Sequence, residues 1–241
     1  IWALIKGKNR DDFISNMIHN KQKIKLWRDI LSNEYKKRGI AEFMNNDVYI
    51  DDSEFLKKVD NDYKKYKFDM LGPSIASPSG ESVNPFPVIK DLDNVNKRIV
   101  RAKKLIKMYE NPLTYFILEN YIKIKHRIKQ PIIPQNGNEV DIKSPLHGCC
   151  IIFSKKYLKK YKNPFFNETF LFHEEEFIFH RVLKANLISL YDPTIRIFHK
   201  EGSSIKKSNK SIRYSKLFKQ KECIKSLELL KKYIQGEIKD E

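Results

Sequence analysis

The chain has 241 residues and a mass of 28.7 kDa, which suffices for a large folded core without metals or disulfides. Its apolar share of 41% and its 8 Gly and 10 Pro exclude the disordered and collagen-like classes. Lys and Arg number 47 against 30 Asp and Glu, a net charge of +17 that favours nucleic acid, anionic lipid or phosphorylated ligands without distinguishing them. The abundance of Lys, Ile and Asn is also what a compositional bias of the genome produces.

The basic excess is local. Residues 97–129 hold ten Lys or Arg against two Glu, and residues 200–241 hold twelve against six acids. Two basic helices there would suit an anionic membrane surface, although ordinary solvated helix faces explain the same charges. The aromatic residues are not spaced as a stacking platform, and no nucleic-acid motif occurs, so we expect no nucleic-acid partner.

The three cysteines do not form a disulfide framework, because Cys149 and Cys150 are neighbours and Cys223 is left over. This usage predicts a reducing compartment. The sequence has no apolar run of the 18 or more residues that a membrane span needs, and its start does not resemble a signal peptide. We therefore predict a cytoplasmic protein, either free or peripheral at the inner face of the cell membrane.

Hydrophobic spacing predicts alternating strands and helices, which is typical of an α/β fold. The expected helices are one or two within 11–38, one from about 51 to 66, a pair over 97–128 broken at Asn111–Pro112, and others at 154–161, 174–185 and 211–234. The expected strands are 40–44, with an apolar segment at 48–50, then 68–71, 148–153, 187–191 and 194–199. Long loops are expected at 72–87 and 131–138, where Pro, Gly, Ser and Asn gather.

Three segments carry residues suited to chemistry. Asp47 follows a strand, where a carboxylate can hold a divalent cation, although Asn and Asp are also common turn residues. Glu174, Glu175 and Glu176 open a helix beside aromatic residues; such acids complement the helix dipole, and apolar surroundings raise a carboxyl pKa towards that of a general base. His199 ends a strand before a Gly/Ser loop and is either structural or a metal or phosphate ligand.

These segments together resemble the family 2 inverting glycosyltransferases of GT-A type, which include bacterial rhamnosyltransferases and other polysaccharide transferases. The residues that carry the resemblance are Asn45-Asn46-Asp47-Val48, Gly148-Cys149-Cys150-Ile151 with His147 before it, Phe166 to Glu175, Arg181, Tyr191-Asp192-Pro193, and His199-Lys200-Glu201-Gly202-Ser203-Ser204. Their order agrees with that of the family. The resemblance covers roughly 40–210, whereas residues 1–39 lack the family's opening strand.

The resemblance implies a GT-A-like mixed sheet flanked by helices over residues 1–210, with an atypical start at 1–39, followed by an amphipathic basic helix at 211–241. It implies that Glu175 deprotonates an acceptor hydroxyl and that Glu174 orients that base or binds acceptor. It further implies Mg²⁺ or Mn²⁺ held by Asp47 near His199, and substrate contacts from His147, Gly148 and Arg181.

The resemblance thus implies transfer of a sugar, with inversion, from a nucleotide-sugar donor to a glycan or lipid-linked glycan acceptor in bacterial surface polysaccharide or capsule synthesis. Two alternatives stay open. In the first, the chain is a non-catalytic basic binding protein; in the second, it is an inactive transferase-like partner in an assembly. A basic binding protein would bind in a salt-sensitive way that is indifferent to Asp47 and Glu175.

Overall fold

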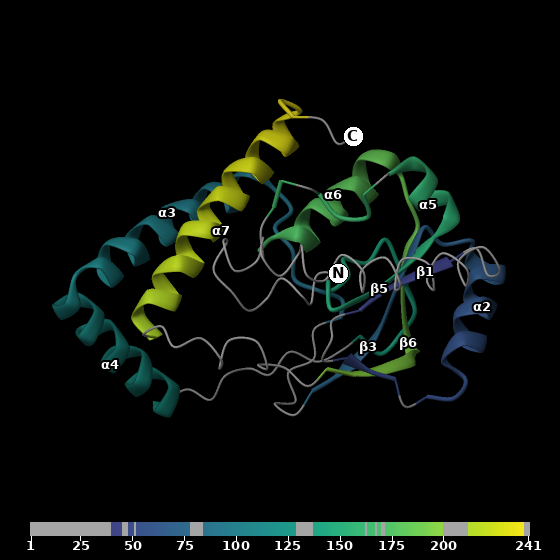
Figure 1. The fold of residues 1–241 in the computed structure, drawn as a ribbon, viewed down its shortest axis with the longest axis horizontal. Coiled ribbons are helices and arrows are strands. Elements are labelled where there is room, and N and C mark those ends of the chain that lie inside the picture. The colour runs from purple at the N-terminus through teal and green to yellow at the C-terminus, as the bar shows by residue number, and fades with distance from the viewer. Residues whose placement is uncertain are drawn as a thin grey trace, which may run out of the picture.

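A mixed sheet with helices on both faces forms the centre of the computed structural model (Figure 1). The structure describes residues 40–44, 48–50, 52–77, 84–128, 137–161, 163–166, 168–169, 172–199 and 212–238. The helices expected within 11–38 lie outside the described residues, as do the 45–47 turn with Asp47, residues 200–211, and most of the loop expected at 131–138.

The strands run in the order β1-β5-β3-β6-β2, and the short β4 pairs with β6. β3 and β6 are parallel, whereas the other pairs are antiparallel. The sheet is therefore mixed, as expected. The strands are β1 (Ile40–Met44), β2 (Val48–Tyr49), β3 (Met70–Ala76), β4 (Asp141–Ile142), β5 (Cys150–Ser154) and β6 (Ser189–His199).

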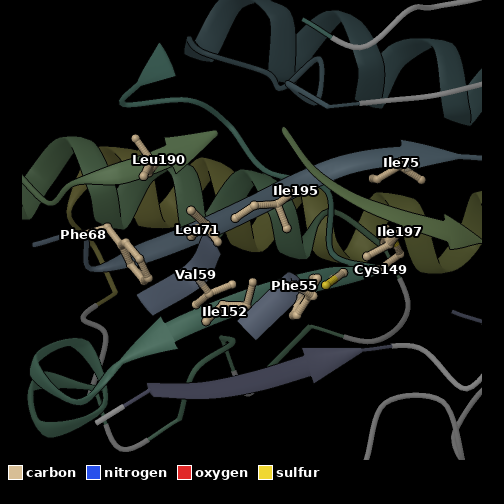
Figure 2. Packing of buried hydrophobic residues seen from close by; sticks show 11 residues of the cluster. Phe55, Val59, Phe68, Leu71, Ile75, Cys149, Ile152, Leu190, Ile195 and Ile197 are labelled. Atoms are coloured by element: carbon tan, nitrogen blue, oxygen red, sulfur yellow. The ribbon is translucent and has the colours of Figure 1, made fainter. Parts of the chain in front are cut away.

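The side chains of the strands contribute to two separate hydrophobic cores, because successive strand residues point to opposite faces of the sheet. On one face, β3, β5 and β6 pack against Phe55 and Val59 of α2 (Phe55–Tyr66), as Figure 2 shows. On the other face, α5 (Lys155–Lys160) and α6 (Glu174–Ala185) cover residues such as Met70 and Phe153. Helix α6 is thereby fixed on the sheet.

A further group of helices lies beyond α6: α3 (Leu92–Glu110), α4 (Pro112–Ile128) and α7 (Ile212–Gln235). Phe177 of α6 stacks on Phe166 with ring centroids 4.4 Å apart, and Tyr233 of α7 packs on both rings. Leu227 of α7 joins the same core. Figure 1 shows α3 and α7 side by side, with α4 at the outer edge. No helix in the described ranges is long and apolar enough to cross a membrane.

Most predicted elements are confirmed, and the differences have local causes. Helix α3 begins at Leu92 rather than near 97, because the Asp91 carboxylate accepts a hydrogen bond of 2.8 Å from the Asn94 amide. The break at Asn111–Pro112 is confirmed. Strand β3 continues to Ala76, into the segment expected to be a loop.

The two strands expected at 187–191 and 194–199 form the single strand β6, whose register against β3 shifts after Asp192. Pro193 follows immediately and has no N–H to donate to a neighbouring strand. Strand β4 was not predicted, because its two exposed residues carry no alternating pattern.

A buried carboxyl pair links α2 to β6 and makes the stability depend on pH. Burial, reinforced by a hydrogen bond to the Asp192 side chain, raises the pKa of Asp62 from 3.8 to about 7. The stabilisation from binding this proton is full below the unfolded pKa and is lost as the pH rises through about 7.

We expect Asp62→Asn to be more stable than the parent above pH 7, by about 1–2 kcal/mol at pH 8, because the amide donates the same bond without the charge. The difference should shrink towards pH 5. Urea unfolding at both pH values measures it. Asp93→Asn, in an exposed ion pair with Lys97, is the matched control. An equal effect of both substitutions at every pH would contradict this account of Asp62.

Candidate active site

A cavity of about 580 Å³ opens where the head of α6 and the segment before β5 meet helices α3 and α7. Its lining is divided between elements: the carboxyl groups come from α6, and the Arg and Lys side chains come from α3 and α7. The titratable lining residues are Glu174, Glu175 and Glu176, His147 and His173, Arg98, Arg101, Lys219 and Cys223.

Glu175 is held by the backbone of the segment that precedes β5. Its Oε1 accepts a hydrogen bond of 3.1 Å from the Gly148 amide. A Cβ atom at position 148 would lie 2.8 Å from that oxygen, so a larger residue there would push the carboxylate away from the amide. The contact joins two segments 27 residues apart in the sequence.

The surroundings of Glu175 favour its neutral form. Burial raises the pKa of this carboxyl, and the neighbouring Glu176 charge raises it further, whereas the Gly148 hydrogen bond acts in the opposite direction. A carboxylate with a raised pKa, anchored through one oxygen in a cavity, has the properties of a general base.

His173 supplies a positive charge at the head of α6. Burial alone would lower its pKa, but hydrogen bonds with Cys223 and with Glu176 outweigh it, so the pKa rises to about 9. The distance from His173 Nδ1 to Glu176 Oε1 is 3.2 Å. At neutral pH the ring is therefore an imidazolium that pairs with the Glu176 side chain beside Glu175.

His147 is fixed in orientation and in tautomer. Its amide donates to Oδ1 of the buried Asn84, whose Nδ2 donates in turn to the Pro73 carbonyl. Its Nδ1 accepts from the Cys149 amide at 3.0 Å, which leaves the proton on Nε2. The neutral imidazole therefore carries its N–H on Nε2, and its ring centre lies 6.3 Å from that of His199.

His199 ends β6, and its strand partner is Val48, the residue that follows Asp47 in the sequence. Val48, the sequence neighbour of the predicted ligand Asp47, therefore lies opposite His199, the other predicted ligand. Asp47 itself lies outside the described residues. Within the described ranges, no group of three or more His, Cys, Asp or Glu side chains is placed to hold a metal ion.

Arg181 does not line the cavity. It is almost fully buried, and its guanidinium donates to the Tyr157 hydroxyl and to the carbonyls of Asn163 and Pro164. These hydrogen bonds fix the chain segment that leads to α6, and the guanidinium does not face the cavity. Glu174, in contrast, is buried against the cavity next to Glu175.

Sequence reasoning did not single out several lining residues. Arg98 and Arg101 stand one turn apart on α3, and Lys219 extends from α7 with its ammonium 5.6 Å from the centre of the Phe172 ring. The only signal for them was the local basic excess, which does not say which cations share a cavity. His173 and Cys223 pair across 50 residues of chain, a separation that no motif spacing reveals.

Comparisons with known proteins leave the site to be interpreted from its own chemistry. No family model, curated protein or solved structure matches the chain. What is established is a mixed α/β fold with a cavity at the head of α6.

The cavity predicts which thiol is accessible. Cys149 and Cys150 are fully buried in the core, whereas Cys223 is half-buried and lines the cavity. We expect iodoacetamide to label Cys223 in the folded protein and all three cysteines in urea, as read by peptide mass spectrometry. Labelling of Cys149 or Cys150 in the folded protein at a rate similar to Cys223 would contradict the structure.

Proposed function

We propose that the chain is an inverting glycosyltransferase of GT-A type, which moves a sugar from a nucleotide-sugar donor to a hydroxyl of a glycan or lipid-linked glycan. The observation that carries the proposal is the contact between Glu175 and Gly148. It joins two of the segments on which the resemblance rests, and it does so inside a cavity that also holds His147.

The reaction needs a base on one side of the sugar and neutralisation of the leaving diphosphate on the other. Glu175 accepts the proton of the acceptor hydroxyl while the hydroxyl oxygen attacks the anomeric carbon of the donor sugar. The bond from that carbon to the diphosphate oxygen breaks on the opposite face, so the configuration inverts. Glu174 is buried beside Glu175, and its proposed role is to orient this base or to bind the acceptor.

The leaving diphosphate requires positive charge and hydrogen-bond donors. Asp47 and His199 would hold a Mg²⁺ or Mn²⁺ ion, which would supply most of that charge. The pairing of Val48 with His199 supports this assignment. The Nε2–H of His147, next to His199, is the proposed donor to a diphosphate oxygen.

Donor binding is the first test. We expect calorimetry to show Mn²⁺-dependent binding of a nucleoside diphosphate from a panel of such nucleotides, because a divalent cation held by Asp47 would neutralise the charge of the diphosphate. Asp47→Ala should weaken the binding at least about tenfold, a loss of roughly 1.4 kcal/mol. Asp141→Ala, which removes an exposed carboxylate of the short strand β4, is the control.

Each alternative gives a different result in this experiment. A non-catalytic basic protein would bind polyanions in a salt-sensitive way, with no effect of Asp47→Ala. An inactive transferase-like assembly partner would bind neither the metal nor any nucleotide of the panel. Either outcome would refute the proposed activity.

The base is tested by its own variant. We expect Glu175→Gln to lower the rate of sugar transfer about 10²–10⁴-fold and to leave nucleoside diphosphate binding intact, because a general base acts only in the chemical step. Gly148→Ala should lower the rate in the same direction, since its Cβ displaces the carboxylate. Glu139→Gln, at an exposed position, is the matched control.

The same base sets the pH dependence. Its pKa is raised, and only the deprotonated form accepts a proton, so the rate should fall on acidification at a pH above the ordinary carboxyl value of 4.5. A pH profile of kcat/KM measures this limb. A rate that stays constant down to pH 4.5 would exclude Glu175 as the base.

A further inference from the structure

Helix α4 carries an apolar face that none of the described residues covers. Five large side chains, which fall on one side of the helix, are each between 55% and 67% exposed: Leu113, Phe116, Ile117, Tyr121 and Ile124. At about 100° per residue they fall within roughly 140° of the helix circumference. Such a run of exposed apolar groups on one face marks an interaction surface.

Positive charge borders this face on both sides. By the same helical spacing, Lys123 and Lys125 fall at its two edges, and both are exposed. The one acid of α4, Glu119, lies on another side and pairs with Lys216 of α7. The α4 face therefore presents apolar groups with lysines at its borders and no described acid.

The start of α7 lies against the corner between α3 and α4. The Arg213 guanidinium donates to the carbonyls of Tyr109 and Glu110, and Lys221 pairs with the Glu110 carboxylate. This end of α7 also exposes Ile212, Tyr214 and Phe218. The start of α7, next to α4, thus also presents both apolar and basic side chains.

We propose that the α4 face docks onto an anionic lipid surface, with its apolar side chains in the acyl boundary and its lysines at the headgroups. An apolar arc with basic borders is the pattern of helices that lie in a membrane interface. Charge complementarity selects this occupant, since the borders of the face are cationic and the chain has a net charge of +17.

One consequence rests on the proposed function. Helix α3 joins α4 directly, and α3 and α7 carry the cationic lining of the cavity. Docking through α4 would hold that side of the cavity close to the bilayer. A lipid-linked acceptor, rather than a glycan in solution, is then the substrate that the docked enzyme meets.

Vesicle binding tests the proposal without any assay of sugar transfer. We expect the chain to sediment with vesicles of phosphatidylglycerol and phosphatidylcholine, and at least tenfold more weakly with phosphatidylcholine alone. The double variant Phe116→Ser/Ile117→Ser should weaken binding to the anionic vesicles at least tenfold. Lys123→Gln/Lys125→Gln should weaken it as well and reduce the preference for them. Leu183→Ser, which removes a similarly exposed apolar side chain of α6, is the matched control.

A tryptophan probe separates insertion from adsorption by charge alone. Phe116→Trp should become accessible to quenching by brominated lipid when anionic vesicles are added, whereas Leu183→Trp should not. Each tryptophan variant is compared with the parent chain, which contains two tryptophans.

Three results would overturn the proposal. The first is a failure to bind anionic vesicles. The second is binding that is unaffected by Phe116→Ser/Ile117→Ser, with Phe116→Trp not quenched. The third is self-association in the absence of lipid that this double variant abolishes, which would assign the face to a second copy of the chain. None of them bears on nucleoside diphosphate binding, so this proposal and the proposed activity fail independently.

Discussion

Burial of β5 on both faces is the constraint on which the architecture depends. All five of its residues are buried, so each face of the sheet must be covered at this strand. Residues of alternate orientation pack under α2 on one side and under α5 and α6 on the other. Gly148 stands just before β5, and Glu175 stands at the head of the helix that covers it. The packing that buries the strand therefore also brings the two residues into contact.

The elements that could be predicted are those with a strong local pattern. The apolar run at 148–153, the acidic start of α6 and the break at Asn111–Pro112 each carry a signal within a few residues, and each is found in the structure. The exact course of β3 and β6 could not be predicted in this way. Their pairing and the register shift at Asp192 depend on segments more than a hundred residues apart.

The candidate site was predictable to the same extent. Glu175 and Gly148 were identified because they belong to motifs, and the structure brings them together. Arg181 belongs to a motif as well, but its burial against Tyr157 and two carbonyls follows from packing that the sequence does not display. The cations of α3 and α7 belong to no motif and enter the site only because the helices assemble around α6.

The division of the cavity lining between elements separates the stability of the scaffold from ligand preference, two properties that often constrain each other within one site. The carboxylates of α6 lie on a buried helix whose preceding loop is fixed by Arg181, so changes there disturb the core. Arg98, Arg101 and Lys219 are exposed, and surface substitutions usually alter stability by less than about 0.5 kcal/mol. Point substitutions on α3 and α7 can therefore change the cationic lining of the cavity without disturbing the packing that holds the carboxylates of α6.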